Sequence, residues 1–148
     1  MFRLANGASG QLTASQVCSG AVNSLRIEIY GDAGSIQWAQ EAPNTMTVSR
    51  RGEPQQVLQP GSNVGYLSAA AIAVCRTPGG HPEGYIEAFA NLYAGFARAV
   101  REYPSHSGTG CASVADGVAT MRFIRAALHS SQKNSAWTNL AGIENKNT

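Results

Sequence analysis

The chain has 148 residues, of which 43% are hydrophobic and 14% are charged, and its formal net charge is only +2. This length and composition predict one folded domain over residues 1–148 and argue against a disordered segment. The small, scattered positive charge argues against a nucleic-acid-binding protein, which usually carries a concentrated basic surface.

Targeting and metal-binding signals are missing from the sequence. No stretch approaches the roughly 18 apolar residues of a membrane span, and the first ten residues lack the apolar centre of a signal peptide. The three cysteines are odd in number and far apart, which suits reduced thiols better than a disulfide framework. No CxxC or HExxH motif occurs, so a zinc site has little support. We therefore expect a cytoplasmic protein with no metal, nucleic-acid or membrane partner.

The first sixty residues predict a meander of about six strands. In the clearest one, SLRIEIYG, the apolar residues Leu25, Ile27 and Ile29 alternate with polar residues and Tyr30, so one face is apolar. An Asn-Gly turn separates the first two strands. The expected strands are 2–5, 11–17, 24–31, 35–40, 45–51 and 55–60.

A helix is predicted over residues 83–102. Apolar residues recur there at three- and four-residue spacing from Ile86 to Val100, which gives one apolar stripe. Pro82 suits the first helical position, and Glu83 in the first turn favours the positive end of the helix dipole.

Two further helices complete the prediction, a short one within 66–75 and a longer one over 114–131. Ser113 and Asp116 form a capping-box pattern before the longer helix. Strands first and helices second indicate an α+β fold: an open, largely antiparallel twisted sheet with helices packed on one face. The other face is then open for a homo-oligomer contact.

The stretch GGHPEGY contains the best candidates for chemistry. His81 lies in a glycine-rich turn, histidine titrates near neutral pH, and Glu83 follows two residues later. The alternative is structural: His81 caps the helix while Gly79, Gly80 and Pro82 shape the turn. The residues alone leave both interpretations open.

Known cofactor and nucleophile motifs are absent. There is no GxGxxG after a strand, no P-loop and no GxSxG turn, and lysine occurs only at Lys133 and Lys146. A catalytic lysine, a phosphate cradle and a dinucleotide site are therefore not expected in these 148 residues.

Several long segments resemble the C-terminal α/β domain of Gfo/Idh/MocA-type NAD(P)-dependent oxidoreductases. GHPEGYIEAFANLYAGFARAV resembles a late helix of that domain, and the segment from NGASGQL to QEAPN resembles its sheet. SVADGVATMRFIRAALHSSQKNSAW is similar to its closing helix and terminal strand. The family's dinucleotide fingerprint, its Glu-Lys-Pro segment and the Asp-and-His motif of this domain have no match. We expect further residues before Met1 in the parent enzyme.

The resemblance implies a role on the substrate side. Family members hold NAD or NADP in a separate Rossmann domain, and the C-terminal domain shapes the site for a small polyhydroxylated substrate and forms oligomer contacts. His81, Glu83, Arg76 and Tyr85 become candidate substrate contacts. The chain alone binds no cofactor on this view and is inactive in isolation.

Two alternatives remain. In the first, the chain is a stand-alone binding or scaffolding module derived from that domain. In the second, it is a small independent enzyme with His81 and Glu83 as acid and base. The second alternative lacks a third group to orient the pair.

Overall fold

The computed structural model describes residues 1–104 and 111–143. The chain divides into two compact units, Met1–Gly84 and Tyr85–Thr148. Residues 105–110 and 144–148 lie outside the described residues. The two units are described separately below.

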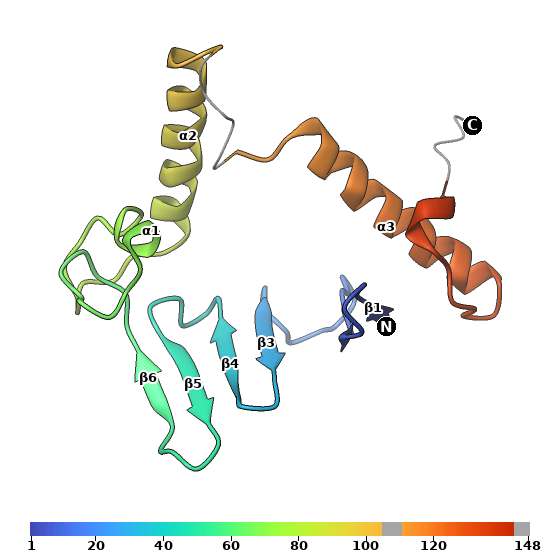
Figure 1. Ribbon diagram of the computed structural model, residues 1–148, viewed down its shortest axis with the longest axis horizontal. Coiled ribbons are helices and arrows are strands. Elements are labelled where there is room, and N and C mark those ends of the chain that lie inside the picture. Colours follow the sequence, from blue (N-terminus) through green and yellow to red (C-terminus); the bar gives the residue numbers. More distant parts are fainter. Residues whose placement is uncertain (105–110, 144–148) are drawn as a thin grey trace. The chain divides into compact units, whose positions relative to one another are not determined.

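The first unit contains a four-stranded antiparallel sheet in the order β3-β4-β5-β6 (Figure 1). Ile27 lies opposite Trp38, and Ile29 lies opposite Ile36 across the β3–β4 pair. Residues opposite each other share a face, so the alternation in the sequence produces one apolar face. The strands are β3 (Arg26–Tyr30), β4 (Gly34–Ala39), β5 (Met46–Arg50) and β6 (Gln56–Leu58).

The remaining two strands form a separate small sheet. β1 (Phe2–Arg3) pairs antiparallel with β2 (Ser9–Gly10) around the predicted Asn-Gly turn. The strand predicted over 11–17 is wrong. In that serine- and threonine-rich run the Ser15 hydroxyl accepts a hydrogen bond from the Val17 amide at 3.2 Å, a local bond that competes with strand pairing.

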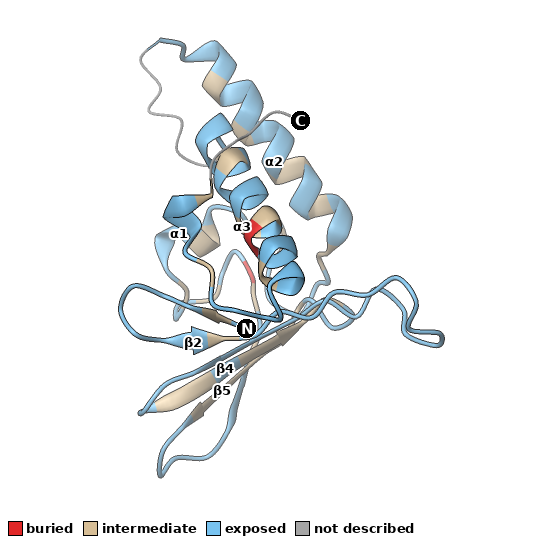
Figure 2. Ribbon diagram, turned by 90° about the vertical axis from the view of Figure 1, so that its right-hand side faces the viewer, coloured by how far each residue is buried: buried red, intermediate tan, exposed pale blue. Residues whose placement is uncertain are grey.

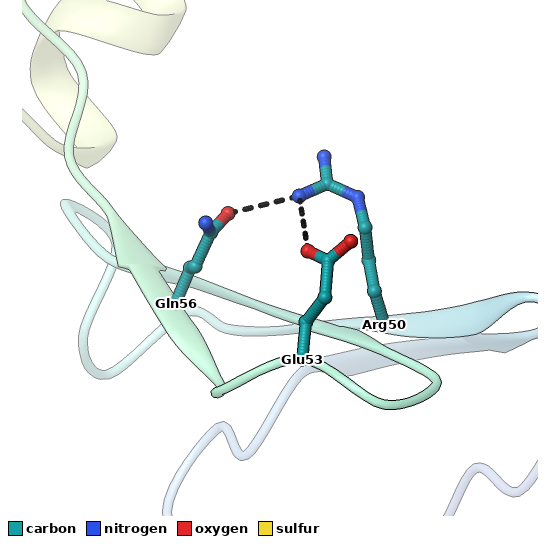
Figure 3. A network of polar contacts seen from close by, with 3 residues as sticks. All are labelled: Arg50, Glu53 and Gln56. Atoms are coloured by element: carbon teal, nitrogen blue, oxygen red, sulfur yellow. Dashed lines mark hydrogen bonds and ion pairs between the residues drawn. The ribbon is translucent and has the colours of Figure 1, made fainter.

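Arg50, the last residue of β5, interacts with the turn and the strand that follow it. The Arg50 Nη1 donates to Gln56 Oε1 at 3.1 Å and lies 3.6 Å from Glu53 Oε2 (Figure 3). The guanidinium therefore bridges the two ends of its own hairpin.

The α+β class and the largely antiparallel sheet are confirmed, and each predicted helix is present. In the first unit α1 (Ala69–Ile72) begins after Ser68, whose hydroxyl accepts a hydrogen bond from the Ala71 amide. In the second unit the long helices are α2 (Tyr85–Arg101) and α3 (Val114–Gln132), followed by the short 3-10 helix η1 (Leu140–Gly142). Among the described residues no helix combines the length and the apolar character that a membrane span requires.

The two long helices differ in how well their first residues were predicted. At α3 the capping box is confirmed: the Asp116 amide donates to the Ser113 hydroxyl, and the Asp116 carboxylate accepts from the Ser113 amide. The helix α2 begins at Tyr85 and not at residue 83. Pro82 and Glu83 therefore lie before the helix, and His81 does not cap it.

Neither unit covers its own apolar residues. Among the described residues only Gly61 and Ala126 are buried (Figure 2). Ile29 on the sheet is 59% exposed and Phe96 on α2 is 62% exposed. Amphipathic elements of this kind are stable only when their apolar faces are covered.

Candidate functional site

Three of the four candidate residues lie in one segment of the first unit, Arg76–Glu83, which we call the 76–83 loop. Arg76 and His81 are exposed, whereas Glu83 is half-buried. The fourth candidate, Tyr85, is the first residue of α2 and belongs to the second unit, where its ring lies 4.7 Å from that of Phe89, centroid to centroid.

Glu83 closes the loop through its side chain. Its Oε1 accepts hydrogen bonds from the Arg76 amide at 2.7 Å, from the Thr77 amide at 2.6 Å and from the Thr77 hydroxyl at 2.7 Å. One carboxylate oxygen thus binds three donors that lie six and seven residues earlier in the chain.

These contacts keep Glu83 ionised. Partial burial raises the pKa of the Glu83 carboxyl, but hydrogen bonds from Thr77 and Arg76, together with the charge of Arg76, outweigh burial and hold the pKa below its ordinary value. The sequence placed this carboxylate at the helix dipole, whereas the structure uses it to organise the preceding loop.

Asn44 fixes the same residue from the sheet side. It lies in the connection between β4 and β5, and its amide nitrogen donates to the Glu83 carbonyl at 2.7 Å. Its Oδ1 accepts a hydrogen bond from the Glu83 amide at 2.9 Å. The sequence prediction missed Asn44, because nothing local distinguishes an asparagine 39 residues away from its partner.

The part of the loop that contains His81 is a tight turn. The His81 amide donates to the Pro78 carbonyl at 3.2 Å, and Gly80 has φ +87°, a left-handed conformation that glycine adopts at little cost. The Thr77 hydroxyl lies 3.1 Å from the His81 carbonyl oxygen. Hydrogen bonds therefore fix the backbone at His81, while its side chain is exposed.

A second connection holds the start of this turn. The Gly79 amide donates to Asn63 Oδ1 at 2.8 Å, and the Ser62 amide donates to the Thr77 carbonyl at 2.8 Å. A Cβ on the buried Gly61 would lie 2.3 Å from the Gly79 nitrogen, so the two backbone segments require glycine there.

The chemistry that this loop offers is hydrogen bonding and charge. A guanidinium donates only, while an imidazole can donate and accept. Within residues 1–104 and 111–143 no three His, Cys, Asp or Glu side chains come together in a way that would hold a metal ion.

The described strands do not form the parallel-stranded dinucleotide-binding fold. Every strand pair in residues 1–104 and 111–143 is antiparallel. The dinucleotide fold instead needs parallel strands with a glycine-rich turn leading into a helix.

Residues 1–140 match the family model described as the C-terminal alpha/beta domain of the oxidoreductase family, Gfo/Idh/MocA. The chain belongs to this family, as its sequence resemblance indicated. It is 39% identical over 95 residues to the uncharacterized oxidoreductase YfiI of Bacillus subtilis strain 168, which covers 64% of this chain and 24% of the relative.

Solved oxidoreductases share the fold. The structure of an oxidoreductase from Sinorhizobium meliloti matches with a TM-score of 0.76 and 38% identity, over 84% of this chain and 35% of that one. An inositol dehydrogenase homologue from Azotobacter vinelandii, complexed with NADH and myo-inositol, matches with a TM-score of 0.76 and 31% identity, over 84% and 34%. The chain thus spans about a third of each of these solved proteins, and the match covers 24% of YfiI.

Proposed function

We propose that this chain supplies the substrate side of an NAD(P)-dependent oxidoreductase that acts on a sugar, polyol or related compound. The observation that carries the proposal is the family match over residues 1–140, combined with an ordered loop that presents Arg76 and His81. The inositol dehydrogenase homologue with bound myo-inositol supports a cyclic polyol as the first ligand to test.

The side chains suit a polyhydroxylated ligand. Each hydroxyl group of a polyol both donates and accepts, so a site for it needs groups of both kinds. Arg76 offers donors, and His81 and Tyr85 each offer a donor and an acceptor. The proposed substrate contacts of the first unit are therefore Arg76 and His81, and Tyr85 is a separate candidate in the second unit.

The chain alone is proposed to be inactive. Hydride transfer needs a nicotinamide held against the reacting carbon, and these residues do not form a dinucleotide site. NAD or NADP then belongs to a part of the enzyme that these residues do not include.

The polar face of the sheet is proposed to form a homo-oligomer. Tyr30 on β3 is 67% exposed and Val57 on β6 is 61% exposed. Tyrosine is enriched at protein interfaces, so an exposed tyrosine here supports a contact with a second copy. The Tyr30 hydroxyl donates to Glu28 Oε2 at 2.7 Å, which orients the ring's polar end. Sedimentation velocity of the chain and of Tyr30→Asp tests this, since a monomer at every concentration would contradict it.

Ligand binding is tested by NMR titration of the ¹⁵N-labelled chain with myo-inositol and, separately, with NADH. We expect shifts of the 76–83 amides with myo-inositol and no saturable binding of NADH. The titration should reach about 50 mM, well above the usual KM range of about 1 µM to 1 mM. Unchanged 76–83 amides with myo-inositol and a panel of sugars, or tight NADH binding, would refute the proposal. A simple aliphatic alcohol is the control.

A further inference from the structure

Glu83 makes two sets of contacts with its own chain. Its carboxylate binds the Arg76 and Thr77 amides and the Thr77 hydroxyl, which closes the loop on itself. Its backbone amide and carbonyl both bind the side chain of Asn44, which connects the loop to the β4–β5 turn.

The carboxylate contacts conflict with a direct role for Glu83 Oε1 in binding. A carboxylate oxygen that already accepts three short hydrogen bonds would have to release some of them to accept one from a ligand. His81, in contrast, points its exposed side chain from the turn that these bonds hold, and the Thr77 hydroxyl lies within reach of both the His81 carbonyl and the Glu83 carboxylate.

We propose that Asn44 and Glu83 are positioning residues: together they hold the 76–83 loop so that His81 is presented to the substrate in one orientation. The proposal rests on the proposed function, because it takes the loop to be part of the substrate site. It reassigns Glu83 from substrate contact to organiser of the loop, and it adds Asn44 to the site.

Amide hydrogen exchange in the full 148-residue chain tests the connection without any ligand. The readout is the His81 amide, whose own acceptor, the Pro78 carbonyl, is untouched by the variants. We expect exchange at His81 to become about tenfold to a hundredfold faster in Glu83→Ala, which loses charge-assisted hydrogen bonds, and about tenfold faster in Asn44→Ala, which loses two neutral ones. Glu53→Gln, a carboxylate in the β5–β6 turn, is the matched control and should leave it unchanged.

The milder variants protect the test against unfolding. Glu83→Gln keeps an accepting oxygen, and Asn44→Asp keeps the acceptor for the Glu83 amide but loses the donor, so both should give intermediate rates. Protection of the β3–β5 amides reports whether each variant is folded. An unchanged His81 rate in all four folded variants would overturn the proposal.

Titration with myo-inositol separates positioning from direct contact. Positioning predicts that affinity falls in step with the His81 exchange rate, by about tenfold in Asn44→Ala and less in Glu83→Gln. Direct contact by the Glu83 charge instead predicts an unaffected Asn44→Ala and a full loss in Glu83→Gln, and that pattern would overturn the proposal. If the wild-type amides ignore every polyol, the proposed function fails, while the exchange result still decides whether Asn44 and Glu83 hold His81.

Discussion

Two carboxylates that precede or begin the long helices, Asp116 and Glu83, make the same kind of bonds over different ranges. Asp116 accepts from the amide and hydroxyl of Ser113, each at 2.7 Å and three residues away. Glu83 accepts from an amide and hydroxyl of Thr77 and from the Arg76 amide, and its backbone binds Asn44 from 39 residues away.

The difference in range decides what each carboxylate does. A capping box satisfies amides of its own first turn, so it can form wherever the local sequence allows a helix. The backbone contacts of Glu83 with Asn44 require the β4–β5 turn to be in place, whereas its carboxylate contacts lie within the 76–83 loop. We infer that the bonds of Asp116 belong to helix formation, and those of Glu83 to the folded sheet unit.

The strongest way to break the long-range set is Gly61→Ala. The added Cβ would meet the Gly79 nitrogen at 2.3 Å and its Cα at 2.6 Å, both backbone atoms that cannot rotate away. We expect the free energy of unfolding to fall by about 3 kcal/mol, as for overpacking at a tight contact. Urea unfolding measures it.

Gly65→Ala is the matched control, because a Cβ there meets nothing within 4 Å. It should change stability by less than about 0.5 kcal/mol. Equal effects of the two substitutions would show that close approach of residues 61 and 79 does not matter.

The next largest effect is expected from Asn44→Ala. It leaves the half-buried amide and carbonyl of Glu83 without the partners they have in the structure, at a cost of about 2 kcal/mol. Asn6→Ala, which removes one exposed side-chain bond to the Ala8 amide, should cost less than half of that. Urea unfolding of both variants compares them, and an Asn44→Ala protein as stable as the wild type would contradict the role of Asn44.

The sequence predicted the fold well where the signal is local. Alternation in SLRIEIYG, the apolar stripe from Ile86 to Val100, and Ser113 with Asp116 each set one element by nearest-neighbour physics. It failed for 11–17, where apolar and polar residues are mixed on both faces and the Ser15 hydroxyl bonds locally to the Val17 amide.

The candidate site was only half predictable for the same reason. His81 and Glu83 could be found because glycine and proline mark their turn, whereas Arg76 and Tyr85 were named only through the family resemblance. The use of Glu83 could not, since Pro82 and Glu83 fit a helix start by local rules and lose to contacts with Asn44 and Thr77 that only the fold creates. Long-range partners carry no local signature.

pH distinguishes the two carboxylates from their neutral replacements. Hydrogen bonds from Ser113 lower the pKa of Asp116, and for Glu83 the bonds from Thr77 and Arg76 outweigh the burial that raises its pKa, so that this pKa is lowered too. Each therefore stabilises the fold above its unfolded pKa, and the contribution disappears as pH falls through the folded pKa.

The third prediction follows from that sign. Glu83→Gln should cost about 1 kcal/mol at pH 7, the difference between charged and neutral hydrogen bonds. The gap to wild type should close below about pH 4. The difference in stability between Asp116→Asn and the wild type should also close in acid. For this variant, helix content follows the unfolding. Urea unfolding from pH 7 to 3 measures both, and a gap for Glu83→Gln that widens in acid would contradict the ionised state.

The smallest effect is expected where a carboxylate bond is local, exposed and outside any cap. Arg50 and Glu53 lie 3.6 Å apart, with their side chains 55% and 54% exposed, in a turn that the backbone already closes (Figure 3). Water screens such pairs, so a double-mutant cycle of Arg50→Ala and Glu53→Ala should give a coupling below about 0.5 kcal/mol. A coupling of about 2 kcal/mol, the size expected for the loss in Asn44→Ala, would mean that exposure and range do not separate these contacts.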